Sequence, residues 1–412
     1  MTWNEYAYAA ARSLIFPVAM VVALSCALPT ARAASGPAAS GEGKLNIELA
    51  ILTREKSAPP LYELDPRPQD EGLQGARLAI DENNTTGAFV GQHFDLDEVV
   101  LDAQQSPVDA ARQLVERGVR LLVLDLPAGE LLAVADALKG SDAVLFNVQA
   151  EDDRLRGVDC RANLFHLAPS RAMLTDALTQ FLSVKRWSRL FLIAGPQADD
   201  QLYAGALKNS AKKFGLKIVA ERPWQFGALA RARSDSVTEA GALDLTRGVD
   251  YDMMIVADEA SDFGDYIPYH TWDPKQLAGT QGLIAATWHP AHAAWGAEQL
   301  QNRFRRQANR WMRPIDYQAW MAVRAIGEAA TNIQSADPVA LRKYMLSPDF
   351  GLAAFKGVAV SFRPWDRQLR QPLLLAQPTF LVASAPQPGF LHQRTPLDTL
   401  GVDQPESTCH AQ

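Results

Sequence analysis

The sequence predicts an α/β protein in which two lobes are each built on a sheet of parallel strands. The first observation is an alternation of short apolar runs with amphipathic segments, which is typical of parallel strands joined by helical crossovers. The second is that this alternation starts again near Ser170. The third is size, because 412 residues exceed what one hydrophobic core usually serves.

Strands and helices alternate through the first part of the chain. In the run NIELAIL the side chains of Ile47, Leu49 and Ile51 share one face, as they do in a strand. The run VRLLVLDL is nearly continuous in apolar residues, which is expected of a strand covered by helices on both faces. We expect strands at 46–52, 94–102, 119–126 and 143–148, and helices at 106–118 and 129–140.

The stretch EGLQGARLAIDENNTTGAFVGQ, residues 71–92, is expected to hold the first crossover helix. Apolar residues from Leu73 to Ile80 recur at spacings of three and four, so one face packs on a sheet. The asparagines at 83–84 compete with helical hydrogen bonds through their side chains, and Gly87 can take a left-handed conformation. The pattern therefore predicts that the helix stops at the asparagines.

The second half repeats this organisation. Ser170 is a suitable N-cap for a helix over 171–187, and Gly215 ends another helix that begins at Asp199. We expect strands at 189–195, 216–223, 250–259 and 282–288, and further helices at 297–312 and 316–330. Two α/β sheets in tandem follow from this order.

Composition excludes some classes of function. The chain is 48% hydrophobic and 21% charged, which is ordinary for a globular protein. Its net charge is -7 and it has no long basic run, so we expect no nucleic-acid partner held through phosphate contacts.

The N-terminus has the pattern of an export signal. An apolar run from Leu14 to Leu28 follows Arg12 and leads to a small-x-small site that ends at Ala33. We predict a signal peptide over 1–33, cleavage near Ala33, and a flexible lead-in over 34–43. The alternatives are an uncleaved anchor, or a lipoprotein joined through Cys26.

Two cysteines remain after this cleavage, Cys160 and Cys409. In an oxidising compartment they permit one bridge, which would tie the C-terminal tail to a mid-chain loop. The alternative is two unpaired thiols, because sequence does not supply the required Cα spacing.

Four stretches carry a similarity to a known family: GLQGARLAIDENNTTGAFVGQ, DLDEVVLDAQQSPVDAARQLVERGVRLLV, FHLAPSRAMLTDALTQFL and WSRLFLIAGPQADDQLYAGALKNSAKKFGLKIV. They resemble the type I periplasmic binding proteins of branched-chain amino-acid ABC importers, and the similarity covers about residues 45–335. Three further stretches are REKSAPPLYELDPRPQDEG, FKGVAVSFRPWDRQLRQPLLL and FLHQRTPLDTLGVDQPESTC. These resemble a narrower group, the ABC substrate-binding proteins associated with PQQ-dependent alcohol dehydrogenase systems.

The resemblance implies a type I periplasmic binding protein fold, in which two Rossmann-like lobes are joined by three crossing segments and close on a small molecule. It places lobe one at 44–168 with 280–335, and lobe two at 169–279 with 336–390. Residues 391–412 form a C-terminal tail. The loops that follow the strand ends then face the ligand.

Five polar or aromatic residues in these loops are candidates for ligand binding. Polar groups in such loops fix a ligand while aromatic neighbours cover it. For each of them the alternative is a solvated loop residue, since most polar loop residues are simply exposed. The candidates are Gln149, Gln197, Tyr203, Glu259 and Trp288.

No motif supports catalysis, a cofactor or a metal site. The chain has no GxxxxGK[ST] phosphate loop, no HExxH and no GxSxG motif. His289 and His292 lack a carboxylate or cysteine at ligand spacing, so they are interpreted as structural or surface histidines. Arg363, Arg367 and Arg370 form a basic cluster beside Trp365. This cluster predicts either a charged hairpin with the tryptophan packed beneath its arginines or a docking surface for a membrane partner or an acidic protein.

The leading functional hypothesis is a periplasmic solute-binding protein that delivers a small organic ligand to the permease of an ABC importer. We expect that the protein is not an enzyme. The alternative is a ligand-sensing or accessory subunit of an alcohol-oxidation system. Neighbouring permease and ATPase genes would favour the first and a sensor kinase gene the second.

We further expect a ligand other than an ordinary α-amino acid. Receptors of that family typically hold the ligand carboxylate with serine or threonine hydroxyls, and the corresponding loops here, LDLPAGE and NVQAEDD, contain neither. These loops place acids near the position of an anion, which disfavours a carboxylate by Coulomb repulsion. The alternative is an anion bound by the backbone N–H groups of Ala128 and Gly129. The acids are Asp125, Glu130, Asp152 and Asp153.

Overall fold

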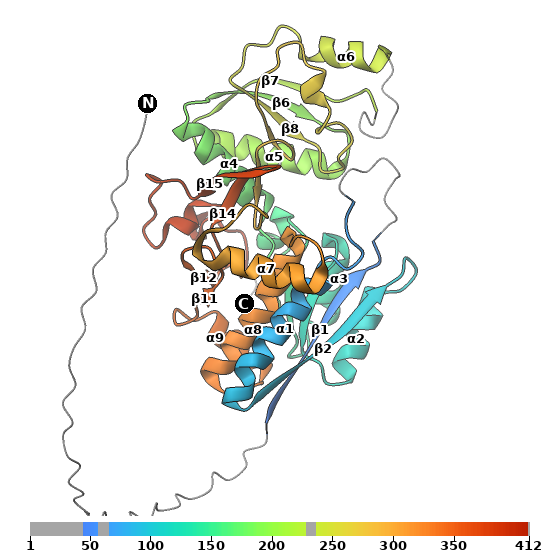
Figure 1. Ribbon diagram of the computed structural model, residues 1–412, viewed down its shortest axis with the longest axis vertical. Coiled ribbons are helices and arrows are strands. Elements are labelled where there is room, and N and C mark those ends of the chain that lie inside the picture. Colours follow the sequence, from blue (N-terminus) through green and yellow to red (C-terminus); the bar gives the residue numbers. More distant parts are fainter. Residues whose placement is uncertain (1–43, 57–65, 228–235, 411–412) are drawn as a thin grey trace, which may run out of the picture. The chain divides into compact units, whose positions relative to one another are not determined.

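A computed structural model describes residues 44–56, 66–227 and 236–410, which form two α/β lobes (Figure 1). Among these residues, lobe one contains a five-stranded parallel sheet in the order β2-β1-β3-β4-β5. The strands are β1 (Leu45–Arg54), β2 (Gln92–Leu101), β3 (Leu121–Asp125), β4 (Val144–Asn147) and β5 (Leu164–His166). The predicted parallel architecture is confirmed.

Helices cover both faces of this sheet. Ile47 and Leu49 of β1 pack with α1 and α8, whereas Ala50 and Leu52 pack with α2 and α3. In Figure 1, α1 and α8 lie on one side of β1 and β2, and α2 lies on the other. The helices of this lobe are α1 (Leu73–Val90), α2 (Pro107–Glu116), α3 (Ala128–Ala137), α7 (Ala297–Ala308), α8 (Pro314–Ile333) and α9 (Pro338–Met345).

The prediction that the first helix stops at the asparagines is wrong, because α1 continues to a left-handed residue at Gly91. The Asn83 side chain donates to the carbonyl of Val323 in α8 at 3.0 Å. The Asn84 side chain donates to the carbonyl of Phe94 in β2 at 2.9 Å and accepts from its N–H at 2.8 Å. Since neighbouring elements engage both amides, they do not compete with the helical hydrogen bonds.

Lobe two contains, within the described ranges, a four-stranded parallel sheet in the order β7-β6-β8-β9. Its strands are β6 (Arg189–Ala194), β7 (Lys217–Pro223), β8 (Met253–Ala257) and β9 (Leu277–Gly279), and its helices are α4 (Arg171–Val184), α5 (Ala198–Lys213) and α6 (Ser236–Thr246). A small antiparallel sheet of β10 (Ile284–Ala286), β14 (Leu373–Gln377) and β15 (Phe380–Ala385) packs against α4. The cap predicted at Ser170 is present, and Ser106 caps α2 in the same way.

Residues 338–369 pack in the core of lobe one, whereas the expected boundaries placed them in lobe two. Leu341, Phe350 and Phe362 are buried in the core of lobe one, next to the residues of α8. The chain joins the core of lobe two only from Leu373 onward. The short strands here are β11 (Leu352–Ala353), β12 (Ala359–Phe362) and β13 (Leu369–Arg370), and the 3-10 helices of the fold are η1 (Asp153–Arg156), η2 (Ile267–Tyr269), η3 (Ala294–Gly296), η4 (Pro396–Thr399) and η5 (Gln404–Glu406).

In the described part of the chain, the backbone passes between the two cores three times, as predicted. The first and third passages run side by side, because the Gln368 side chain donates to the carbonyl of Ala168 at 3.0 Å and the Gln371 side chain to that of Leu167 at 2.8 Å. The core residues that flank the passages are Leu167 and Met173, Leu283 and Trp288, and Leu369 and Leu373.

A buried lysine joins the second and third passages. The ammonium of Lys356 donates to the carbonyl of Thr287 in the second passage and to that of Pro372, at 3.3 Å, in the third. Its Nζ also lies 5.2 Å from the centre of the Tyr317 ring. Burial lowers the pKa of Lys356 from 10.5 to about 7.

The C-terminal segment contacts both lobes. A disulfide joins Cys409 to Cys160 with a Cα–Cα distance of 5.6 Å, so the predicted bridge is present. Farther back, the N–H of Gly401 donates to Asp176 of α4 at 2.8 Å, and Lys213 of α5 donates to the Gly401 carbonyl at 2.9 Å. The tail is therefore held covalently to lobe one and by hydrogen bonds to lobe two.

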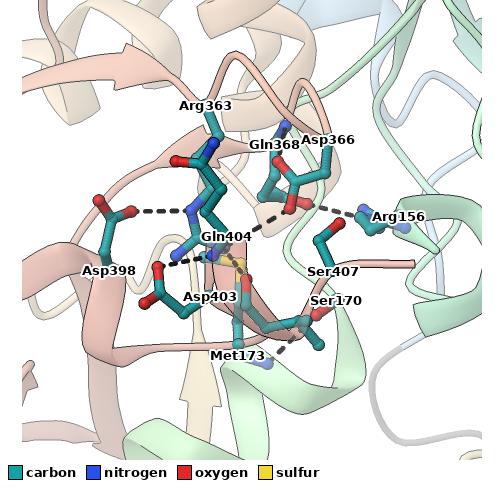
Figure 2. A network of polar contacts seen from close by, with 12 residues as sticks. Arg156, Ser170, Met173, Arg363, Asp366, Gln368, Asp398, Asp403, Gln404 and Ser407 are labelled. Atoms are coloured by element: carbon teal, nitrogen blue, oxygen red, sulfur yellow. Dashed lines mark hydrogen bonds and ion pairs between the residues drawn. The ribbon is translucent and has the colours of Figure 1, made fainter. Parts of the chain in front are cut away.

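Arg363 is the centre of this tail network (Figure 2). Its guanidinium donates to Asp398 at 2.9 Å and to the carbonyl of Leu400 at 2.7 Å. Arg363 and Arg370 both lie over the Trp365 ring, at 5.4 and 5.1 Å from its centre. The docking-surface interpretation of these arginines is wrong for Arg363, which is 1% exposed, and the hairpin interpretation is confirmed.

Candidate functional site

A cavity of about 970 Å³ lies between the lobes and is lined by both of them. Lobe one contributes the loops after β3 and β4 and the start of α8. Lobe two contributes the start of α4, the start of α5 and the loop after β8. The lining residues used below are Arg67, Glu71, Ala128, Gly129, Gln149, Glu151, Asp152, Arg154, Arg171, Gln197, Asp199, Tyr203, Asp258, Glu259, Asp262 and Arg313.

The position of the cavity follows from the topology. In parallel α/β sheets the loops at the carboxyl ends of the strands lie at one edge, and neighbouring crossovers leave a crevice there. The loops after β3, β4, β6 and β8 all end in this cavity. The loops after β4, β6 and β8 supplied four of the five candidate residues of the sequence analysis.

The structure brings four of the five candidates together. Gln149 after β4, Gln197 and Tyr203 in or before α5, and Glu259 after β8 all line the cavity. Tyr203 is 4% exposed, and burial, followed by the negative charges of Glu259 and Glu151, raises its pKa. Its hydroxyl is therefore neutral over the physiological range.

The fifth candidate, Trp288, lies elsewhere. It is 1% exposed and belongs to the core of lobe one, where its ring stacks on Tyr317 with centres 4.6 Å apart. Its indole N–H donates to Gln301 at 2.9 Å. The prediction that Trp288 covers a ligand is wrong, because the chain after β10 turns into the core of lobe one.

A residue that sequence reasoning missed, Arg171, lies at the centre of the cavity wall. It begins α4, and its Nε–H and one Nη–H donate to the two carboxylate oxygens of Glu259, each at 2.6 Å. It also pairs with Asp152 at 3.2 Å and Asp199 at 3.3 Å. Burial lowers the pKa of Arg171, but the hydrogen bonds and charge of Glu259 outweigh burial, so its pKa is raised. The available signal was the arginine directly after the Ser170 cap, in the first turn of α4.

Two buried aspartates shape the lobe-two wall of the cavity. Asp200 accepts from the N–H of Gln197 at 3.1 Å and from that of Glu259 at 2.7 Å, so it joins α5 to the loop after β8. Asp258 accepts from the N–H groups of Phe263 and Gly264 at 2.8 and 2.7 Å. Both carboxylates are occupied by backbone donors and act as supports for the loop.

Most backbone donors at the edge of the cavity are already used. The side-chain oxygen of Asn147 accepts from the N–H groups of Gln149 and Ala150 at 3.1 and 2.8 Å. In the first turn of α4, the N–H of Ala172 donates to Asp153 at 2.9 Å. The first turn of α3 differs, since Ala128 and Gly129 line the cavity and their N–H groups make no hydrogen bond to the described residues.

Only some of the acids that the sequence analysis placed near the ligand line the cavity in the structure. Asp125 is paired with Lys56 at 2.7 Å, Glu130 with Arg54 at 2.8 Å, and neither lines the cavity. Asp152 does line it, and so does Glu151, which sequence reasoning did not single out.

Glu151 differs from the other acids of the cavity. Its carboxyl has no hydrogen-bond or ion-pair partner among the residues that the structure describes. Burial, and then the charge of Glu259, raise its pKa to about 7. The Tyr203 hydroxyl and the Gln149 amide also lack a partner in the described ranges.

Other kinds of site were considered on the same residues. In the described ranges no three His, Cys, Asp or Glu side chains are grouped so that they can hold a metal ion. The predicted structural role of His292 agrees with its contact to the Phe355 carbonyl at 2.8 Å. None of the helices described here combines the length and apolar character that a membrane span needs.

Comparison with known proteins relates this geometry to a family. Residues 68–241 match a family model described as periplasmic binding protein. Among curated proteins there is no match to the chain.

Solved structures match over most of the chain. A branched-chain amino-acid ABC transporter periplasmic ligand-binding protein from Burkholderia xenovorans LB400 is 18% identical, with a TM-score of 0.64 over 82% of this chain and 95% of that one. An ABC transporter substrate-binding protein from Sphaerobacter thermophilus is 17% identical, with a TM-score of 0.66 over 83% and 98%. The branched-chain amino-acid transporter substrate-binding protein LivJ from Streptococcus pneumoniae, solved with isoleucine, is 16% identical, with a TM-score of 0.61 over 82% and 98%. The fold of this chain is that of the type I periplasmic binding proteins.

Proposed function

We propose that this protein is the solute-binding component of an ABC importer and holds a small organic molecule in the cavity between its lobes. The observation that carries the proposal is the cavity itself, which lies at the carboxyl ends of strands from both sheets and exposes polar groups without protein partners. The family match and the shared fold support the same function. The proposed partners are the small organic ligand and the importer's permease.

A second candidate is a ligand-sensing or accessory subunit of an alcohol-oxidation system. This candidate rests on the stretches of the sequence that resemble proteins of PQQ-dependent alcohol dehydrogenase systems. Closure of two lobes around a ligand changes the surface that any partner meets, so the same cavity serves either function.

Export is part of the proposal. Residues 1–43 lie outside the described residues, so the signal peptide and its cleavage near Ala33 remain predictions from the sequence. N-terminal sequencing of protein from the periplasm should start near Ala34. Full-length chain found solely in the cytoplasm would contradict export.

The proposal predicts a solute that is retained in the cavity. Native mass spectrometry of protein purified mildly from its own cells should show one added mass. Gly129 lies in the cavity wall, and a side chain added there meets no atom within 4 Å, so Gly129→Leu should fill the cavity without straining α3. The matched control is Gly140→Leu, at an exposed glycine with equally open surroundings and outside the cavity lining.

We expect the added mass on the wild type and on Gly140→Leu, and its loss from Gly129→Leu. Equal retention by both variants would place the solute elsewhere. Once the solute is identified, its uptake by a strain that lacks the gene separates the two candidates. Lost uptake supports import, whereas normal uptake with impaired alcohol oxidation supports the second function.

A further inference from the structure

We propose that the cavity selects a small organic cation, a molecule with an ammonium group and no adjacent carboxylate, and that Glu151, Tyr203 and Gln149 receive this ammonium group. The inference rests on the proposed function, because it names the chemical class of the solute. It also narrows the expectation from the sequence, which left a neutral polyol, an alcohol-derived molecule or a cation open.

The first argument concerns acceptors. An ammonium group has three N–H donors, and a carboxylate, a hydroxyl oxygen and an amide oxygen can each accept one. Glu151, Tyr203 and Gln149 supply these three acceptors in one cavity, and none has a hydrogen-bond partner among the described residues. The Tyr203 side chain is 4% exposed and lines the cavity, so its hydroxyl is completed there by water or by a ligand.

The second argument concerns charge. Among the described residues, the lining carries seven carboxyl groups and four guanidinium groups. The guanidinium of Arg171 is already shared by three of those carboxylates. Arg313 pairs with Glu71 at 3.3 Å, and Arg154 pairs with Asp152 at 3.6 Å. The cavity therefore presents an excess of negative charge, which attracts a cation and repels an anion.

The third argument concerns the donors that a carboxylate would need. The N–H groups after β4 are taken by Asn147, and that of Ala172 in the first turn of α4 is taken by Asp153. Among the described residues, the donors still open in the lining include the N–H groups at the start of α3, the Tyr203 hydroxyl, the Gln149 amide and the guanidinium of Arg67, which is exposed. An anion bound there would lie beside Glu71 and Glu151, so we infer that the solute carries none.

The charge of Glu151 gives the binding a characteristic pH dependence. The groups that act on it are Glu259, which raises its pKa, and Arg171, Arg156 and Arg67, which lower it; burial is the largest effect and the pKa is about 7. Tyr203 stays neutral. An ammonium ion binds to the ionised carboxylate, and an alkylamine remains protonated up to about pH 10. Affinity should therefore rise from pH 6 to pH 8 by about tenfold, because a carboxyl with this pKa is roughly one-tenth ionised at pH 6.

A matched series of four compounds tests the chemical class. 3-Methylbutylamine, 3-methyl-1-butanol, 4-methylpentanoate and leucine share one branched carbon skeleton and differ in the ammonium and carboxylate groups. Calorimetry on ligand-free, full-length mature protein should detect binding of the amine, tighter at pH 8, and at least tenfold weaker binding of the other three. Equal or tighter binding of leucine, the acid or the alcohol overturns the inference, as does a lack of binding by the amine.

Two variants connect the result to the residues. Glu151→Gln keeps the size of the side chain and removes the charge, and it should weaken amine binding at least tenfold and abolish its pH dependence. Tyr203→Phe should weaken it at both pH values. The charge-matched control is Glu298→Gln, at an exposed residue of α7 outside the cavity, which should bind like the wild type. Unchanged amine affinity in Glu151→Gln, with the fold confirmed by circular dichroism, overturns the assignment of Glu151.

Failure of this inference and failure of the proposed function give different results. If the solute retained in native mass spectrometry is an acid or a neutral molecule that Gly129→Leu excludes, the solute-binding function stands and the cation assignment is overturned. If Gly129→Leu retains the solute as well as the wild type does, the proposed function fails and the cation assignment fails with it.

Discussion

Arg363 in the C-terminal network and Glu151 in the cavity differ in how far the protein itself satisfies their charges. Arg363 is 1% exposed, yet its guanidinium donates to Asp398 (Figure 2). It also donates to the carbonyls of Leu397 and Leu400. Glu151 is partly exposed to the cavity and has no such partner in the described residues. The first charge is complete without a ligand, and the second is not.

This difference separates stability from recognition. A buried charge with all its partners contributes to the native fold, and its removal leaves other buried groups unsatisfied. A charge held without partners destabilises the ligand-free protein, and it stabilises a complex in which the ligand supplies the missing partner. In the absence of ligand, substitutions in the two regions should therefore change the free energy of unfolding in opposite directions. The expected changes follow from the largest to the smallest.

The largest loss is expected from Arg363→Met. It removes the donor to Asp398 and to two tail carbonyls, although Asp398 keeps Arg370 at 2.8 Å. Loss of one partner from a buried ion pair costs about 3 to 5 kcal/mol, and the remaining arginine favours the lower end. Urea unfolding with the disulfide intact measures this change. Arg394→Met, at an exposed residue over the same Trp365 ring, should cost less than about 1 kcal/mol; equal costs would mean that the network adds no stability.

The next loss is expected from removal of the disulfide. With Cys160 and Cys409 both changed to serine, the free energy of unfolding should fall by about 2 to 4 kcal/mol, because the bridge restricts the unfolded chain across a long loop. The wild type in reducing buffer should unfold at the same urea concentration as this variant. Two free thiols found by mass after alkylation without reductant would contradict the bridge.

Lys356 gives a pH-dependent effect. Its pKa falls from 10.5 to about 7 on folding, so between these values the unfolded chain holds more protons than the folded chain. Stability should therefore rise with pH in this window, by up to about 1.4 kcal/mol per pH unit for one proton. Lys356→Met should lose this slope, while Lys343→Met, at an exposed lysine, should keep it. A slope shared by all three proteins would show that other groups cause it.

The smallest effect is a gain. The pKa of Glu151 rises from 4.5 to about 7 on folding, so the folded chain holds more protons in this window and stability falls as pH rises through it. At pH 8 without ligand, Glu151→Gln should be more stable than the wild type by about 1 kcal/mol. Glu298→Gln should stay within about 0.5 kcal/mol of the wild type. A destabilised Glu151→Gln variant would mean that this carboxylate supports the fold.

The sequence analysis located the cavity better than it located the individual contacts. Strand ends are marked by local patterns, so the loops with Gln149, Tyr203 and Glu259 could be identified from the chain. Trp288 also follows a strand, but whether it faces the cavity or the core depends on where the backbone turns next. Arg171 and Glu151 were missed because their roles depend on residues of the other loops.

Local patterning determined the α/β class, the parallel strands and most caps, because hydrophobic periodicity and helix signals act within a few residues. The tertiary structure decided the rest. It kept α1 helical through Asn83 and Asn84 by supplying partners in α8 and β2, and it drew residues 338–369 into the core of lobe one. It also left the Glu151 carboxyl group without a partner among the described residues, while the Arg171 guanidinium gained three. The number of partners that a buried polar group has depends on contacts between distant segments, and these exist only once the chain has folded.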